Sequence, residues 1–181
     1  LLVMTEGASA QYKDAKMITV RRESCKKSSK ILGISNIEFL DFEDMKLDSI
    51  PQIEINKQIE KLIKKIKPKI VYTAPKNDLN KDHEITFNST LVATRPNSSI
   101  VKSVYCYELP GYVKLPFLPN HFEDITKQFT NKIRAFKMYK SEVMKFPHPR
   151  SIKAVENLAI YRGVQSGVSK AEAFELIKNI D

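Results

Sequence analysis

Short apolar runs alternate with longer segments of helical periodicity along the first half of this 181-residue chain. The predicted strands are Leu1–Thr5, Ile37–Leu40 and Lys69–Ala74, and the predicted helices between them are Met17–Leu32 and Pro51–Ile66. Gly33 follows the first helix directly and Pro68 lies two residues beyond the second, as helix-ending residues do. Because strand and helix alternate in this way, the sequence predicts an α/β fold with a mainly parallel sheet flanked by helices.

The second half of the chain continues with less regular signals. We expect a helix at His83–Arg95 that turns Ile85, Leu91 and Val92 toward the core, followed by a strand at Val101–Leu109. An irregular Pro-rich crossover is predicted at Pro110–Phe122. Helices are predicted from Lys127 onward, and the last has Ala171, Phe174 and Ile177 on one face. No internal repeat or linker divides the sequence. The chain is therefore predicted to form a single domain, residues 1–181.

Composition limits the cellular context. The content of hydrophobic residues, 42%, suffices for one core, while the longest apolar runs are far shorter than a membrane span. Cys25 and Cys106 are isolated, which excludes a Cys-x-x-Cys metal or redox motif and makes a disulfide framework a poor fit. We expect a soluble, cytoplasmic protein with no membrane span.

The net charge of +9 raises the question of a nucleic-acid partner. The lysines are spread along predicted helices and do not cluster with aromatic residues, which favours solvated helix faces. A phosphate-bearing substrate is the functional alternative. The sequence therefore predicts no nucleic-acid partner.

The dipeptide Asp82-His83 is the most specific chemical signal. It follows a predicted strand at a loop-to-helix junction, where open α/β sheets bind ligands. An imidazole at such a place can ligate zinc while a neighbouring carboxylate sets its tautomer. A helix-capping Asp beside a surface His is the alternative interpretation.

Several short motifs, taken in their order and spacing, carry a family resemblance over nearly the whole chain. They are Thr5–Gly7, Arg21–Glu23, Phe39–Asp44, Asp82–His83, Pro119–Ile125, Phe146–Ser151, Arg162–Gly163 and Ala171–Phe174. With these motifs the chain resembles the LmbE-like, PIG-L-type N-acetylglucosamine deacetylases. The resemblance implies a Rossmann-like fold and a zinc ion (Zn2+) that assists hydrolysis of an N-acetyl group. The partner it implies is a small-molecule amino-sugar substrate, linked to a nucleotide, a lipid or another sugar.

By the resemblance, His83 is one zinc ligand. The family's other two protein ligands and its catalytic base lie in a His-Pro-Asp-Asp-Glu motif on a preceding strand, and this sequence contains no such run. We therefore expect the chain to be N-terminally incomplete and inactive by itself. Truncation, disorder with a chain break, and loss from the gene are three open explanations.

The general acid is a second departure from the family pattern. Many relatives carry His-x-Asp-His, and here the first position is Asn80, whose amide donates a hydrogen bond but does not usefully exchange a proton. Asp82 is retained and is assigned a catalytic role by the resemblance. His148 is a candidate replacement acid, with packing between two prolines as the alternative.

Substrate contacts are implied at three further positions, Glu6, Arg21 and Asp44. Arg21 could pair bidentately with a phosphate or orient a carboxylate, and an exposed helix arginine is the alternative. Ser24 stands where relatives carry a Glu partner for that arginine. For His121 a role in loop packing is favoured.

Two functions from different classes remain open at this stage. The first is a zinc-dependent deacetylase, and the alternative is a metal-free carbohydrate-binding or structural remnant of the same fold. The βαβ pattern also predicts that Thr5, Asp44 and His83 converge near the carboxyl ends of their strands. A homo-oligomer is compatible with the sequence.

Overall fold

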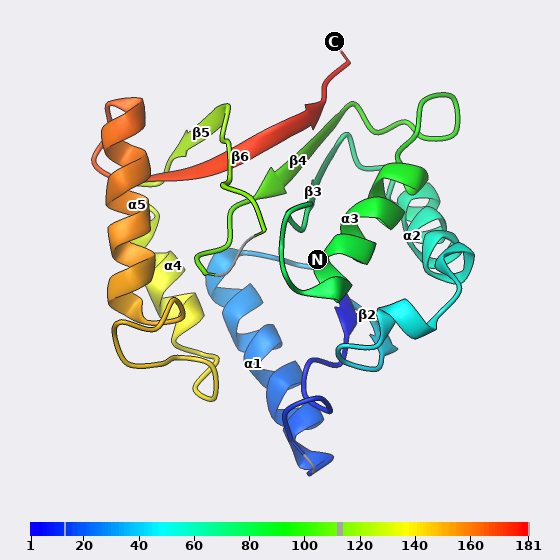
Figure 1. Cartoon of the computed structure of the whole chain (residues 1–181), viewed down its shortest axis with the longest axis horizontal. Coiled ribbons are helices and arrows are strands. Elements are labelled where there is room, and N and C mark those ends of the chain that lie inside the picture. Colours follow the sequence, from blue (N-terminus) through cyan, green and yellow to red (C-terminus); the bar gives the residue numbers. More distant parts are fainter. Residues whose placement is uncertain (13, 112–113, 181) are drawn as a thin grey trace. The chain divides into compact units, whose positions relative to one another are not determined.

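The computed structural model describes residues 1–12, 14–111 and 114–180. Its elements in chain order are β1 (Leu2–Thr5), α1 (Lys16–Leu32), β2 (Glu38–Phe42), the 3-10 helix η1 (Leu47–Ser49), α2 (Gln52–Ile66), β3 (Ile70–Thr73), α3 (Lys81–Ala93), β4 (Ser103–Tyr107), β5 (His121–Asp124), α4 (Phe129–Phe136), α5 (Ile152–Ser166) and β6 (Ala171–Lys178) (Figure 1). None of the helices in these described ranges combines the length and the apolar character that a membrane crossing requires.

Strand pairing confirms the predicted α/β class. β1 pairs in parallel with β2, and β3 pairs in parallel with β4. The second sheet has the order β3-β4-β6-β5, with β6 antiparallel to β4. The chain divides into two compact units, one of Leu1–Asp44 with Phe122–Glu172 and one of Met45–His121 with Ala173–Asp181.

In the first unit, α1 packs against α4, with small polar residues on its buried side. Ser24, Cys25, Ser28 and Ser29 are buried there, and small side chains let a neighbouring helix approach closely. Gly33 ends α1 in a left-handed conformation with φ of 73°, at which glycine is free of steric strain. The predicted helix boundary is therefore correct at its C-terminal end.

In the second unit, α2 packs against α3 (Figure 1). On α2, Ile55, Ile59 and Ile63 are buried at helical spacing, whereas Ile66 is exposed. On α3 the predicted core face is shifted. Ile85, Leu91 and Val92 are only half-buried, and the fully buried side is formed by Phe87, Ser89, Thr90 and Ala93.

The prediction of a last helix at Ala171–Ile177 is wrong, because this segment forms strand β6. Ala, Glu and Leu favour helix locally, but pairing with β4 supplies the backbone hydrogen bonds and buries Ala173 and Phe174. Two of the helices expected after Lys127 are present, as α4, which ends at Phe136, and α5, which begins at Ile152.

Candidate functional site

In the second unit, the loop from β3 to α3 carries the Asp82-His83 element. Asn80 is the N-cap of α3, and its side-chain oxygen accepts the backbone N–H of Asp82 at 2.9 Å. Asp78 precedes it and accepts the backbone N–H of Asn80 at 2.7 Å through Oδ1. The cap is therefore Asn80 and not Asp82, which removes helix capping as an explanation for the aspartate.

The side chain of His83 is held by Asp78. Nδ1 of the imidazole lies 2.9 Å from Oδ2 of Asp78, whose residue is only 8% exposed. An ionised carboxylate only accepts hydrogen bonds, so Nδ1 is the donor and the lone pair of the neutral ring is on Nε2. His83 itself is partly exposed, with 35% of its side chain open to solvent. This is the orientation that an imidazole needs to bind a metal through Nε2.

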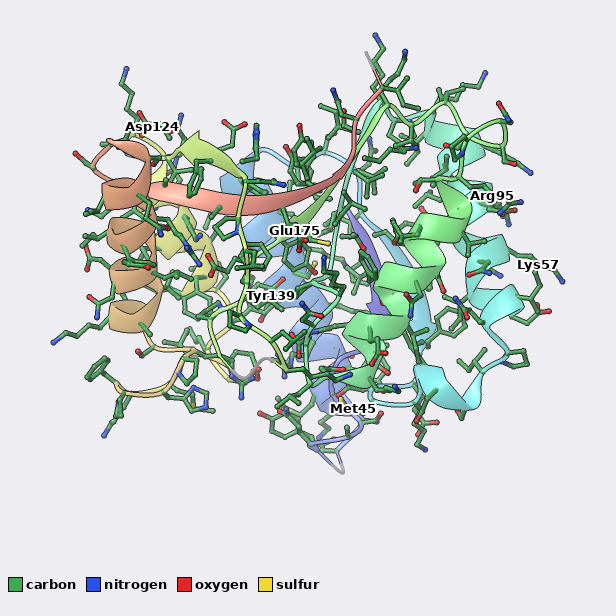
Figure 2. The ribbon with its side chains drawn as sticks, turned by 45° about the horizontal axis from the view of Figure 1, so that its top comes forward. Met45, Lys57, Arg95, Asp124, Tyr139 and Glu175 are labelled. Atoms are coloured by element: carbon green, nitrogen blue, oxygen red, sulfur yellow. The ribbon has the colours of Figure 1, made fainter. Side chains whose placement is uncertain are left out.

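The carboxylate of Asp82 is occupied by the segment that follows β2. Oδ2 accepts the backbone N–H of Met45 at 2.8 Å, and Oδ1 accepts that of Leu47 at 3.0 Å. Asp82 is buried, and Leu47 is fully buried beside it. Met45 is labelled in Figure 2. Asp82 therefore fastens residues 45–47 to the start of α3, while its catalytic role stays a prediction.

In the first unit, Glu6 and Asp44 lie at the carboxyl ends of β1 and β2. Glu6 accepts backbone N–H groups from Ala8 and Ser9 through Oε2, and from Asp44 through Oε1. The hydroxyl of Thr5 donates to Oδ1 of Asp44 at 3.5 Å. Burial opposes ionisation of Glu6, but hydrogen bonds from the Ser9 side chain and from these backbone groups lower its pKa overall. Both carboxylate oxygens of Glu6 thus accept hydrogen bonds from loop backbone groups. Substrate contact by Glu6 or Asp44 stays a prediction.

Arg21 belongs to a buried charge cluster that sequence reasoning does not find. Its Nη2 lies 2.6 Å from Oε1 of Glu142, and Nη1 of Arg150 pairs with Oε2 of the same carboxylate. The side chains of Arg21 and Glu142 are 14% and 11% exposed, which excludes the alternative of an exposed helix arginine. Relatives carry a glutamate partner for this arginine at the position of Ser24. In this chain the carboxylate partner of Arg21 is Glu142, which is distant in sequence.

His148 makes the opposite hydrogen bond to that of His83. Its Nδ1 accepts the backbone N–H of Arg150 at 3.0 Å, so the proton of its neutral ring is on Nε2. His121, by contrast, packs its ring on Tyr105 and Phe174, with centroid distances of 4.9 and 6.2 Å. The favoured packing role of His121 agrees with these contacts.

The predicted site residues thus fall into two groups. Glu6, Arg21, Asp44 and His148 lie in the first unit, and Asp82 and His83 lie in the second. The convergence of Thr5 and Asp44 with His83 therefore stays a prediction. Asp78 has a sequence signal, since an Asx turn two residues before a helix cap is a recognisable pattern, whereas Glu142 has none.

A zinc ion implied by the family resemblance would find one suitable ligand here. His83 fits, because its Nδ1 is bound by a carboxylate and its Nε2 lone pair is free for coordination. Within residues 1–12, 14–111 and 114–180, no three His, Cys, Asp or Glu side chains are grouped so that they could hold a metal ion.

A sequence profile of the PIG-L family, described as GlcNAc-PI de-N-acetylase, matches residues 1–94, which is more than half of the chain. The chain belongs to the PIG-L family. The family description and the fold neighbours indicate N-acetyl-sugar deacetylase activity, and the matched region includes both Glu6 and the Asp82-His83 element. Among curated protein sequences, none matches the chain significantly.

Solved structures share the fold of this PIG-L chain at low sequence identity. N,N'-diacetylchitobiose deacetylase from Pyrococcus horikoshii superposes with a TM-score of 0.79 and 21% identity, over 98% of this chain and 72% of that one. A conserved protein from Thermus thermophilus has a TM-score of 0.81 and 22% identity, over 99% and 81%. The hydratase GalB from Pseudomonas putida has a TM-score of 0.73 and 20% identity, over 94% and 76%. The predicted Rossmann-like fold is thus confirmed, and because a hydratase shares it, the chemistry must be argued from the site.

Proposed function

We propose that this protein is a zinc-dependent hydrolase that removes the N-acetyl group from an N-acetylated amino sugar of the GlcNAc type, linked to a nucleotide, a lipid or another sugar. The observation that carries the proposal is His83, which stands in the matched family region with its Nε2 free and its Nδ1 bound to Asp78. Such an imidazole is suited to one coordinate bond to a metal.

In the proposed site, His83 supplies one protein ligand to the metal through Nε2. The chemistry supplied by zinc in such sites is polarisation of the amide carbonyl and acidification of the attacking water. Asp82 keeps the start of α3 fixed by holding the backbone of Met45 and Leu47. This restraint limits the movement of His83, which is the next residue.

The departing amine needs a proton, and we assign its donation to His148. Asn80 stands where relatives carry a histidine, but its side chain caps α3 and has no exchangeable proton of suitable acidity. His148 has the complementary arrangement, since the hydrogen bond from Arg150 to Nδ1 leaves Nε2 as a donor. The two histidines thus carry opposite tautomers, one suited to ligation and one to donation.

Further features fit an amino-sugar substrate in the cytoplasm. The guanidinium groups of Arg21 and Arg150 share the single carboxylate of Glu142, which leaves net positive charge for an anionic group on the substrate. Cys25 and Cys106 are buried free thiols, as suits a reducing compartment.

The test measures metal content and acetate release from N-acetylglucosaminyl substrates in the purified protein and its variants. His83→Ala should lose tight zinc binding and activity together, because a ligand is removed. His148→Ala should retain zinc and release acetate about 100-fold more slowly, as expected for loss of a general acid. His121→Ala is the matched control, since the ring of His121 packs on Tyr105 and Phe174.

Stoichiometric zinc and full turnover in His83→Ala would rule out the assigned ligand. An unaffected His148→Ala would return His148 to a packing role. A wild-type protein that binds amino sugars without zinc and without turnover would instead support the metal-free carbohydrate-binding alternative.

A further inference from the structure

A surface that is both basic and apolar lies at the amino ends of β3 and β4 in the second unit (Figure 1). Ile66, Ile70 and Ile100 are 55%, 50% and 55% exposed there. Exposed lysines surround them, from the end of α2, the segment before β3 and the segment before β4: Lys64, Lys65, Lys67, Lys69 and Lys102. We call these lysines and isoleucines the basic edge.

Hydrogen bonds hold the parts of the basic edge side by side. The backbone oxygen of Lys69 accepts the backbone N–H of Lys102 at 2.7 Å, which joins the two segments that enter β3 and β4. The ammonium group of Lys178 donates to the backbone oxygens of Thr94 at 2.6 Å and Val101 at 3.0 Å, and so fixes the loop before β4. Lysines that are distant in sequence are therefore neighbours in the fold.

The segments that form the basic edge carry cations and no carboxylates. Residues 61–70 and 96–102 contain neither Asp nor Glu. Glu60 precedes the first segment and is paired with Arg95 at 2.9 Å. Lys64 and Lys65 also suit the negative end of the α2 dipole, but this explains neither the further lysines nor the exposed isoleucines. The basic edge is therefore a local concentration of positive charge.

Lys67 occupies a backbone conformation that glycine adopts at lower cost. It ends α2 with φ of 55° and ψ of 51°, and its backbone N–H donates to the oxygen of Ile63. Glycine is the usual residue at such a position, because a Cβ is strained in the left-handed region. The cation of Lys67 is thus present at the expense of local stability, which separates its side chain from a role in folding.

We propose that the basic edge docks on the surface of an anionic phospholipid membrane, with its lysines at the lipid phosphates and its isoleucines inserted between the headgroups. Positive charge beside exposed apolar side chains complements such a surface in both respects. A second copy of the same basic surface would be repelled. Nucleic acid offers phosphates but buries no isoleucine, and residues 61–70 and 96–102 contain no aromatic residue or arginine to stack on bases.

The basic edge is separated from the loop that carries His83 by the length of β3. This strand has 4 residues, which span about 13 Å, and the loop to α3 leaves from its carboxyl end. A membrane at the basic edge would therefore leave this loop uncovered. The proposal does not depend on the proposed hydrolase function.

The experiment is sedimentation of the purified protein with lipid vesicles at physiological salt. Vesicles of phosphatidylcholine with about one third phosphatidylserine should bind the protein, because the anionic headgroups attract the lysines. Vesicles of phosphatidylcholine alone should bind it far less. Ile100→Ser should weaken binding to the mixed vesicles about 10-fold, because it removes an apolar side chain that inserts, and should leave the affinity for a DNA duplex unchanged.

Lys67→Gly separates docking from folding. It should weaken vesicle binding about 5-fold, the usual contribution of one lysine at an anionic membrane, while the thermal unfolding midpoint stays at or above that of wild type. The matched control is Lys57→Gln, which removes the same charge at the other end of α2 (Figure 2). Lys57 lies about 15 Å along the helix from Lys67, beyond the screening length, so this variant should bind like wild type.

Equal binding to both kinds of vesicle, or to neither, would overturn the proposal. An equal loss in Lys57→Gln and Lys67→Gly would also overturn it, since net charge alone would then account for binding. Unchanged vesicle binding in Ile100→Ser would contradict insertion. Tighter binding to a DNA duplex than to the mixed vesicles, weakened by Lys67→Gly, would assign the basic edge to nucleic acid instead.

Discussion

At the scale of single residues, buried and half-buried carboxylates organise this chain more than its histidines do. Glu6, Asp78, Asp82 and Glu142 each bind at least two partners, and most of these partners are backbone N–H groups or arginines. Such bonds to a charged group are stronger than bonds between neutral groups. Residues that the family pattern marks for catalysis therefore also hold the loops in place.

Glu142 provides the prediction at this scale. Glu142→Gln leaves Arg21 and Arg150 with no carboxylate between them, and we expect the free energy of unfolding to fall by about 3 kcal/mol, the lower end for breaking a buried ion pair. Urea unfolding followed by circular dichroism measures this change. Glu23→Gln removes the exposed pair with Lys26 and should leave the free energy of unfolding almost unchanged. If both variants lost the same free energy of unfolding, the claim that burial makes the Glu142 ion pairs more stabilising would be contradicted.

At the scale of elements, the exit from α5 depends on a glycine inside the helix. A Cβ at Gly163 would lie 2.6 Å from the carbonyl oxygen of Val168 and 2.9 Å from the backbone of Ser169. Val168 also donates its N–H to the oxygen of Gly163 at 3.0 Å. The chain therefore turns back directly over Gly163 before β6 begins.

Helix propensity and packing make opposite predictions for Gly163→Ala. Propensity alone would stabilise the helix by about 1 kcal/mol. The clash with backbone atoms should outweigh this gain, because backbone cannot rotate away, and we expect a net loss of about 2 kcal/mol in urea unfolding. At Gly167 a Cβ meets nothing, but φ is 76°, so Gly167→Ala should cost about 1 kcal/mol and Gly167→Asn less. Stabilisation by Gly163→Ala would show that the turn can move.

At the scale of the whole molecule, the net charge of +9 predicts only non-specific attraction to nucleic acid. Binding of a mixed-sequence DNA duplex can be followed by fluorescence anisotropy. The affinity should fall steeply between low and physiological salt, because the release of counterions from the DNA drives binding and is less favourable at higher salt. Duplexes of different sequence should bind alike. Tight, sequence-dependent binding at physiological salt would contradict this expectation and favour a nucleic-acid function.

The sequence by itself determined the features that depend on local pattern. Short apolar runs located β1 and β3, period-3.6 segments located α1 and α2, Gly33 marked the end of α1, and ordered motifs identified the PIG-L family. Local pattern also located the junction that carries His83, since a strand followed by a polar loop and a helix needs no distant contact.

Only the tertiary structure decided the features that depend on distant partners. Ala171–Lys178 became a strand because β4 lies beside it, against its own helix propensity. The partner of Arg21 came from Glu142, and the use of Asp82 was set by Met45 and Leu47, all remote in sequence. A hydrogen bond or a strand pair acts through space, so the residues that make it leave no periodic trace along the chain.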